Sequence, residues 1–115
     1  PAVVALALER GIGFATTPVS TTICSGWTLD EGHRLRAMID AGLTISVSTD
    51  DAMFFRTDIG KEYREGLMAL GVDAATAKRI ALAGIDISFA DAATKARLRG
   101  EFEGAFIALD ALLEP

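Results

Sequence analysis

Two adjacent carboxylates, Asp50 and Asp51, are the residues of this sequence best suited to chemistry. They directly follow residues 43–49, in which apolar and polar side chains alternate. This alternation predicts a β-strand. Ligands of parallel α/β folds bind at the carboxyl ends of the strands, so the pair is a candidate for ligating a metal or accepting hydrogen bonds from a substrate. Capping of the next helix is a simpler role that the sequence leaves open.

The single histidine and the single cysteine indicate less. His33 lies early in a predicted helix beside Arg34, where a solvent-facing or locally hydrogen-bonded role is favoured over metal ligation. A catalytic zinc needs about three protein ligands, and the sequence offers no His-x-His pair and no second histidine. Cys24 has no CxxC partner, so we expect a small buried residue rather than a nucleophile. This chain therefore cannot build a catalytic zinc site unaided.

Aromatic and charged residues around these candidates allow further expectations. Trp27 either lines a pocket or anchors a loop, and Phe54 and Phe55 either pack at the mouth of a barrel or form one wall of a substrate pocket. The charged residues among 61–65, Glu62 included, predict a solvent-exposed helix face.

Hydrophobic periodicity and turn residues predict helices and two strands. Helices are expected over residues 3–10, 28–42, 57–71, 73–89 and from 91 onward, strands over 12–17 and 43–49, a polar loop over 19–26 and an apolar loop over 52–56. Thr28, Thr57 and Asp73 are the expected N-caps, and Asp91 is expected to begin the last helix. Gly100 and Gly104 could interrupt that last helix.

The order of these elements predicts an incomplete fold. Two strands joined by a crossover helix should be parallel neighbours, and parallel strands are normally buried within a larger sheet. A (β/α)8 barrel takes about 250 residues, so 115 residues with two βα units fit the last portion of one. We therefore expect an α/β chain in which residues 1–115 form a single segment, the C-terminal portion of a TIM barrel.

Composition excludes several classes of partner. The formal net charge is −5 and the basic residues are scattered, which argues against binding to nucleic acid. No apolar run approaches the about 20 residues of a membrane span. The start of the sequence lacks both an initiator Met and the basic residues of a signal peptide. A lone cysteine cannot form an intrachain disulfide, so we expect a reducing compartment, the cytoplasm.

Several short motifs occur in the same order as in one known family. They are residues 17–21 (Thr-Pro-Val-Ser-Thr), Gly26-Trp27 with His33, residues 48–52 (Ser-Thr-Asp-Asp-Ala) followed by Thr57 and Glu62-Tyr63, and Ser88-Phe89 followed by Lys95 and Leu98. This order resembles that of the adenosine deaminase family, in which a Cys-Pro-x-Ser segment precedes Thr-Asp-Asp-Pro and then Glu-Tyr and Ser-Phe. The resemblance covers nearly the whole chain, and it is specific because several motifs recur together.

The resemblance implies a zinc-dependent purine aminohydrolase, part of a metal-dependent hydrolase barrel. By position Asp50 would be a catalytic residue that binds the metal and orients the attacking water. Asp51 would hydrogen-bond a purine ring nitrogen, and Ser20 would line the pocket or support the metal ligand. One Zn²⁺ is implied, whose remaining ligands lie outside this chain in the missing N-terminal part of the barrel. The 115 residues alone would then be inactive.

Departures from the family pattern leave the substrate open. Ala52 replaces the usual Pro, Thr17 the Cys, Thr21 the Asn or Ser, and Ala83 an Asn. Adenosine, adenine and other purine nucleosides or bases all remain candidates. Two other classes of function also stay open: a non-catalytic half-barrel that serves packing or oligomerisation, and an Mg²⁺ site for phosphoryl chemistry, which would need a Gly-rich phosphate loop that the sequence lacks.

Overall fold

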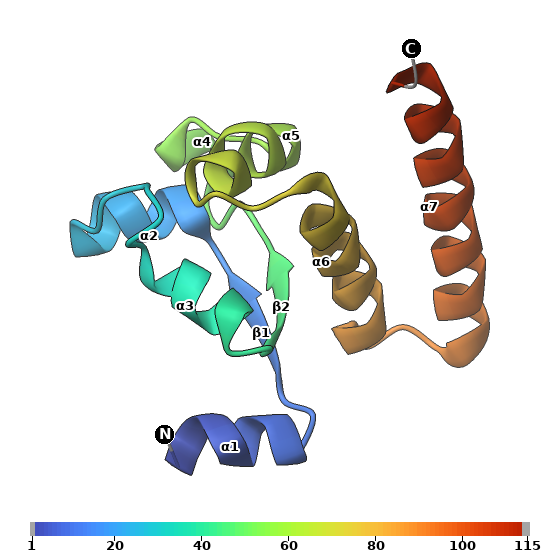
Figure 1. Ribbon diagram of the computed structural model, residues 1–115, viewed down its shortest axis with the longest axis horizontal. Helices are drawn as coiled ribbons and strands as arrows, with labels where there is room; N and C mark the ends of the chain where they lie inside the picture. The colour runs from blue at the N-terminus through green and yellow to red at the C-terminus, as the bar shows by residue number, and fades with distance from the viewer. Residues whose placement is uncertain (1, 114–115) are drawn as a thin grey trace.

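Two parallel strands and a set of helices make up the chain, as the computed structural model of residues 2–113 shows (Figure 1). Strands β1 (Gly13–Thr16) and β2 (Thr44–Val47) pair in parallel, from Gly13 beside Thr44 to Thr16 beside Val47. The sheet described has these two strands and does not close into a barrel. The predicted parallel pair is confirmed, and its positions agree with the alternation of apolar and polar side chains.

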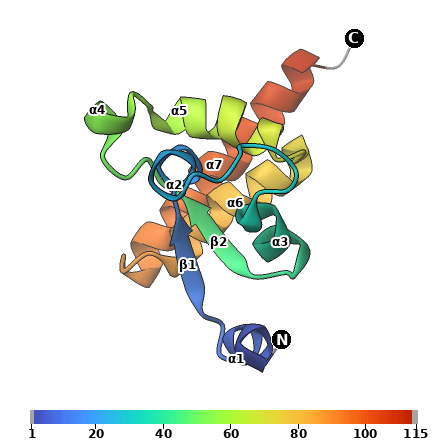
Figure 2. The ribbon, with the colours of Figure 1, turned by 90° about the vertical axis from the view of Figure 1, so that its left-hand side faces the viewer.

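The helices occupy both ends and the outside of this sheet. They are α1 (Ala2–Glu9), α2 (Pro18–Ser25), α3 (Arg34–Asp40), α4 (Ala52–Phe55), α5 (Ile59–Lys61), the π-helix η1 (Glu62–Leu67), α6 (Ala74–Ile87) and α7 (Ala92–Leu113). Figures 1 and 2 show α2, α4 and α5 at the carboxyl end of the strands and α1 at the opposite end. The strands' carboxyl ends are thus surrounded by short helices that this chain itself supplies.

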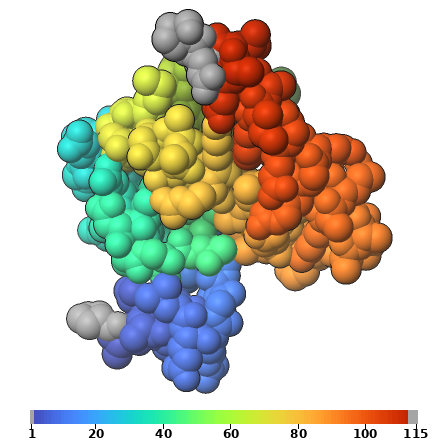
Figure 3. Space-filling view, turned by 45° about the vertical axis from the view of Figure 1, so that its right-hand side comes forward, coloured from blue at the N-terminus to red at the C-terminus, as the bar shows by residue number. Residues whose placement is uncertain are grey.

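One hydrophobic core joins β2 to its neighbours. It is made of six buried side chains from β2, α3, α6 and the region of η1: Leu35, Ile45, Val47, Leu67, Leu70 and Ile80. Figure 3 shows α7 as a ridge on the outside of the molecule and α1 projecting from one end. In α1 only Ala7 is buried. The hydrophobic core therefore lies between β2, α3, α6 and the region of η1. Helix α1 buries only Ala7 and is joined to the rest mainly by its covalent connection to β1.

Two of the expected helix starts are confirmed. Asp73 accepts a hydrogen bond from the backbone N–H of Thr76 at 2.7 Å, and Asp91 accepts one from Thr94 at 2.9 Å. Helix α7 runs unbroken through both of its glycines, so the considered interruption does not occur.

The other two expected N-caps are wrong. His33, not Thr28, caps α3, because Asp30 folds residues 28–32 into a turn by accepting from the backbone N–H of Gly32 at 2.8 Å. Asp58, not Thr57, caps α5 and accepts from the backbone N–H of Lys61 at 2.8 Å.

Helix α2 replaces the polar loop that the sequence predicted. Pro18 starts it, and the fixed φ of proline suits the first helical position. Gly26 ends it with a left-handed φ of 66°. The hydroxyl of Thr22 donates back to the carbonyl of Pro18 at 3.0 Å, so this Ser/Thr-rich segment satisfies its side chains within the helix. The predicted apolar loop over 52–56 likewise contains a one-turn helix, α4.

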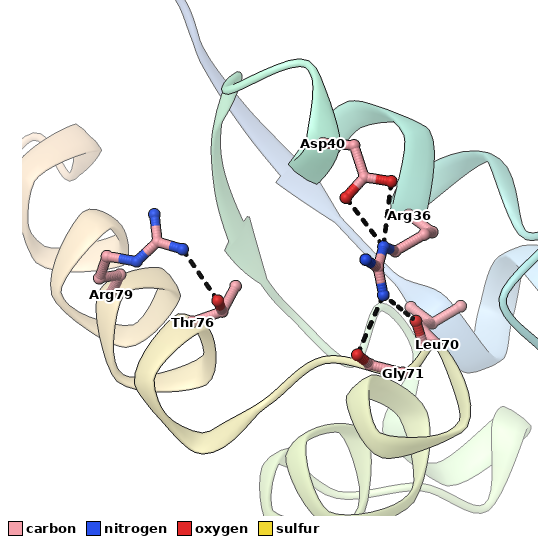
Figure 4. A network of polar contacts seen from close by, with 6 residues as sticks. All are labelled: Arg36, Asp40, Leu70, Gly71, Thr76 and Arg79. Carbon is pink, nitrogen blue, oxygen red and sulfur yellow. Dashed lines mark hydrogen bonds and ion pairs between the residues drawn. The ribbon is translucent and has the colours of Figure 1, made fainter.

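Arg36 ties α3 to the chain after η1 (Figure 4). Its Nη1 donates to the carbonyls of Leu70 and Gly71 at 3.1 and 3.0 Å, and its Nε pairs with Asp40 at 2.9 Å. Gly71 has a φ of 68°, and a Cβ there would lie 3.1 Å from Nη1. The glycine therefore permits both the turn and the close approach of the guanidinium.

No helix of the described part of the chain is long and apolar enough to cross a membrane.

Candidate functional site

Ser20 and Asp50 meet at the carboxyl ends of the two strands. Ser20 lies in the first turn of α2 after β1, and Asp50 lies in the segment between β2 and α4. The Ser20 hydroxyl donates to Oδ2 of Asp50 at 2.7 Å, a short distance typical of a hydrogen bond to a carboxylate. Ser20 is buried whereas Asp50 is exposed. Two residues that the sequence analysis singled out separately are thus joined in one site.

Backbone and hydroxyl contacts hold the ends of the strands together beneath this pair. The Thr16 hydroxyl donates to the carbonyl of Ser46 at 2.7 Å, and the backbone N–H of Ser48 donates to the carbonyl of Thr16 at 2.8 Å. The segments that leave β1 and β2 therefore start from fixed positions.

Asp50 has a left-handed backbone conformation, with φ of 57°. This region is uncommon for residues other than glycine, although Asp and Asn adopt it more readily than most. Backbone strain of this kind concentrates at functional sites, where the surrounding structure maintains it. Here it turns the chain sharply between the end of β2 and the start of α4.

Asp51 caps helix α4. Its Oδ1 accepts from the backbone N–H of Phe54 at 3.3 Å, so the capping role that the sequence left open applies to this carboxylate. Phe54 is 75% exposed, and its ring packs edge-on against that of Phe55, with 5.1 Å between the centroids. An exposed carboxylate thus follows Asp50 directly in the chain, with an exposed aromatic side chain in the short helix after it. A contact of Asp51 with a substrate stays a prediction.

Glu62 is fully buried, so its expected place on a solvent-exposed helix face is wrong. The Thr57 hydroxyl donates to its Oε1 at 2.8 Å, and the backbone N–H of Val19 donates to its Oε2 at 3.2 Å. Charge patterning alone could not reveal this, because one partner lies 43 residues away. The signal that could have revealed it is the Glu62-Tyr63 pair, which belongs to the family motifs.

His33 serves the start of α3 and not the site at Asp50. Its Nδ1 accepts from the backbone N–H of Leu35 at 3.1 Å, and its ring packs edge-on against Trp27 at 5.4 Å between centroids. Burial lowers the pKa of His33, although Asp30 partly opposes this. The expected locally hydrogen-bonded role is confirmed. Both rings line a cavity of about 440 Å³ between β1, α2 and α3.

Cys24 is exposed in α2, so the expectation of a buried cysteine is wrong. It lies in the last turn of α2, where residues 23–25 are all exposed.

Asp50 could serve as one protein ligand of a metal ion. Within residues 2–113 no group of three or more His, Cys, Asp or Glu side chains could hold a metal ion. Asp50 is exposed, and Ser20 occupies its Oδ2 and leaves Oδ1 available. A carboxylate oxygen suits zinc as one of several ligands. The geometry therefore fits one corner of a metal site.

The sequence of this chain is similar to those of several deaminases. The family model described as adenosine deaminase matches residues 2–104. An aminodeoxyfutalosine deaminase from Streptomyces coelicolor is 33% identical over 104 residues, 90% of this chain and 27% of the relative. An adenine deaminase from Agrobacterium fabrum is 31% identical over 97 residues, 84% of this chain and 30% of the relative. The chain thus spans less than a third of the length of these relatives.

Structure comparison agrees with the sequence. An amidohydrolase from Burkholderia ambifaria, solved with bound zinc, matches 98% of this chain and 32% of its own, with a TM-score of 0.86 and 29% identity. An adenine deaminase from Arthrobacter aurescens shows the same fold, with a TM-score of 0.84 and 24% identity over 91% of this chain. These neighbours are TIM-barrel proteins, so the predicted fold class, an incomplete (β/α)8 barrel with two parallel strands, is confirmed. Because motifs, family model and fold agree over almost its whole length, the chain belongs to the adenosine deaminase family.

Proposed function

We propose that residues 1–115 are the C-terminal segment of a metal-dependent hydrolase barrel that removes the amino group of an aminopurine by hydrolysis. The observation that carries this proposal is the Ser20–Asp50 hydrogen bond of 2.7 Å at the carboxyl ends of two adjacent parallel strands. Active sites of TIM barrels lie at this end of the strands. The family match supports the reaction class.

Asp50 would be the residue of this chain that holds a zinc ion. Its carboxylate is exposed, its backbone conformation is fixed, and Ser20 holds one of its oxygens. A bound zinc would supply a Lewis acid that lowers the pKa of a coordinated water. The carboxylate of Asp50 itself would also accept a hydrogen bond from the attacking water and so orient it. Bound zinc in the amidohydrolase from Burkholderia ambifaria supports this cofactor.

Asp51 would recognise the purine base. One of its oxygens is engaged with the backbone N–H of Phe54, which fixes the carboxylate and leaves the other oxygen for a ring nitrogen. The exposed Phe54 ring beside it could cover one face of a flat base. Ser20 would act mainly on Asp50, since its buried hydroxyl already donates to that carboxylate.

The substrate would carry an adenine-like ring. Among the relatives is an adenine deaminase that is 31% identical to this chain, which supports free adenine as one candidate beside adenosine. The second named activity, aminodeoxyfutalosine deamination, belongs to a relative of similar identity, 33%.

The rest of the barrel would be the main partner of this segment, in a cytoplasmic protein. Val3 is 79% exposed and Leu6 is 45% exposed on α1, an apolar surface that further barrel elements would cover. The chain covers 27% of one relative and 30% of another, which is consistent with such a larger unit. The remaining zinc ligands would come from that part.

A non-catalytic half-barrel is the second candidate. The observation that favours it is that the residues described supply no complete metal site. In that case the same α1 surface would serve packing or oligomerisation.

Intact mass, zinc content and turnover of the purified natural protein separate the two candidates. The deaminase proposal predicts a mass well above 12.1 kDa, bound zinc and release of ammonia from adenine or adenosine. A homogeneous 12.1 kDa protein that holds no zinc and deaminates neither compound would refute it and leave the half-barrel.

A further inference from the structure

We propose that Glu62 is a positioning residue of the metal site, which acts on Asp50 through the first turn of α2. This inference rests on the proposed function, because it concerns how well Asp50 is placed to hold the metal. Glu62 would not touch substrate or metal. Its role would be to fix Ser20, whose hydroxyl holds Oδ2 of Asp50.

The burial of Glu62 is costly and calls for a reason. Its side chain is fully buried, and its two oxygens accept from two neutral donors, the Thr57 hydroxyl and the backbone N–H of Val19. Within residues 2–113 the ion pairs found do not include Glu62. A buried charge without a cationic partner is expensive, and an apolar side chain of similar size would pack at lower cost. Packing alone therefore does not explain a glutamate at this position.

Glu62 supplies the acceptor that α2 otherwise lacks. The first backbone N–H groups of a helix have no partner within the helix, and a side chain just before the helix usually accepts one of them. Thr17 stands in the N-cap position of α2 but makes no such bond. The Val19 N–H instead donates to Oε2 of Glu62 at 3.2 Å. A negative charge at this end of the helix is also favourable for the helix dipole.

The anchored turn is the one that carries Ser20. Val19 directly precedes Ser20, so a fixed Val19 N–H limits where the Ser20 hydroxyl can lie. Helix η1 also lies directly against this turn, because a Cβ built on Gly66 would be in ordinary contact with the Cβ of Pro18 at 3.4 Å and with Oε2 of Glu62 at 3.5 Å. A path of direct contacts thus leads from Glu62 through the first turn of α2 to the Asp50 carboxylate.

The position of Glu62 in η1 is consistent with a functional role. Glu62 is the first residue of this six-residue π-helix. π-helical turns are rare and occur frequently at functional sites, because the wider turn redirects side chains that an α-helix would place elsewhere. Its other oxygen is held by Thr57, which lies between α4 and η1. The carboxylate therefore joins the segment that follows Asp50 to the helix that carries Ser20.

The test measures zinc affinity of the full-length protein by competition with a chelator, together with thermal stability. Glu62→Met keeps the volume and removes both acceptors, and we expect it to weaken zinc binding about tenfold, since partners of metal ligands typically contribute 10–100-fold. Glu62→Gln keeps an acceptor for the Val19 N–H, and we expect its zinc affinity to stay within about threefold of that of the wild type. Ser20→Ala should weaken binding to a similar degree as Glu62→Met.

Non-additivity gives the sharpest readout. If Glu62 acts through Ser20, the double variant Ser20→Ala with Glu62→Met should bind zinc no more weakly than Ser20→Ala alone, within about twofold. Leu67→Ala is the matched control, since Leu67 is a buried core residue of the same helix. It should lower the melting temperature and leave zinc affinity unchanged. Should Glu62→Met fail to fold, Thr57→Val removes one donor, keeps the carboxylate and should show the same non-additivity with Ser20→Ala.

Two results would overturn the inference. In one, Glu62→Met lowers stability as Leu67→Ala does but binds zinc like the wild type, which would make Glu62 a purely structural residue. In the other, the losses of Ser20→Ala and Glu62→Met multiply, which would show that they act independently. A wild-type protein without zinc affinity would refute the proposed function, and this inference with it.

Discussion

The strained backbone and the carboxylate of Asp50 can be tested separately with three substitutions. Asn keeps the left-handed conformation and an oxygen that can accept from Ser20, but it removes the negative charge. Gly accepts the φ of 57° without strain and removes the side chain. Ala removes the same side-chain functional group but meets the steric cost of that φ. Comparison of the three variants separates the effect of the backbone conformation on stability from the effect of the carboxylate on zinc binding.

The expected magnitudes follow from these contacts. Ala and Gly both leave the buried Ser20 hydroxyl without its acceptor, so this loss cancels between them. Their difference is the left-handed conformation, which costs a non-glycine residue about 1–2 kcal/mol. Asp50→Gly should therefore be more stable than Asp50→Ala by about that amount, with Asp50→Asn near the wild type. Zinc affinity and deamination should fall in all three by more than the about 100-fold that loss of a supporting residue can cause.

Chemical denaturation gives the stabilities, and chelator competition with an ammonia-release assay gives the function of the full-length protein. Equal stabilities of Asp50→Ala and Asp50→Gly would contradict the left-handed conformation at this position. Zinc binding and turnover retained in Asp50→Asn would contradict the role of Asp50 as a metal ligand, whatever the stabilities show.

Three further predictions concern the fold around the site. Gly13→Ala would place a Cβ 2.5 Å from Cγ2 of Ile87, so it should cost about 1–3 kcal/mol in unfolding free energy, and Ile87→Ala should restore only part of this because its Cβ stays 2.8 Å away. Burial lowers the pKa of His33 below its usual value of 6.5, so the unfolded chain binds the proton more readily. Stability should hold above about pH 6.5 and fall as the pH drops below it, and His33→Asn, which can still cap α3, should flatten this slope in urea titrations at several pH values. Arg36→Met should cost about 1–2 kcal/mol because it frees two backbone carbonyls, whereas Arg79→Met, whose contact shown in Figure 4 lies within α6, should change stability by less than about 0.5 kcal/mol; equal effects in denaturant melts would refute this distinction.

The sequence predicted best what depends on short-range pattern. The strand before Asp50 was found because its alternation of side chains matches burial on one face, with Ile45 and Val47 buried. The caps at Asp73 and Asp91 were found because a carboxylate can satisfy the N–H three residues on without help from elsewhere. These features use contacts that are close in sequence.

The features that the sequence did not predict depend on hydrogen-bond partners far along the chain or on a residue type that is uncommon at its position. Glu62 looked solvent-exposed because its donor on α2 is 43 residues away. Helix α2 looked like a loop because its capping acceptor is that same distant carboxylate. His33 was overlooked as a cap because histidine is not among the residues preferred there. For Glu62 and α2 the missing information was a tertiary contact, whereas for His33 it was a local contact made by an unusual capping residue.

The positions of Asp50 and Ser20, which form one corner of the candidate metal site, are set by residues of this chain. The left-handed turn at Asp50 lets β2 end and α4 begin within a few residues, so that Asp51 can cap α4 while Asp50 faces Ser20. Glu62 anchors the turn that carries Ser20, and the hydrogen bonds between Thr16 and the end of β2 fix where both segments start. Each of these contacts lies within residues 13–66 and needs no ligand from another part of a barrel. Since an ordered ligand pays less conformational entropy when metal binds, such a corner would lower the cost of completing the site.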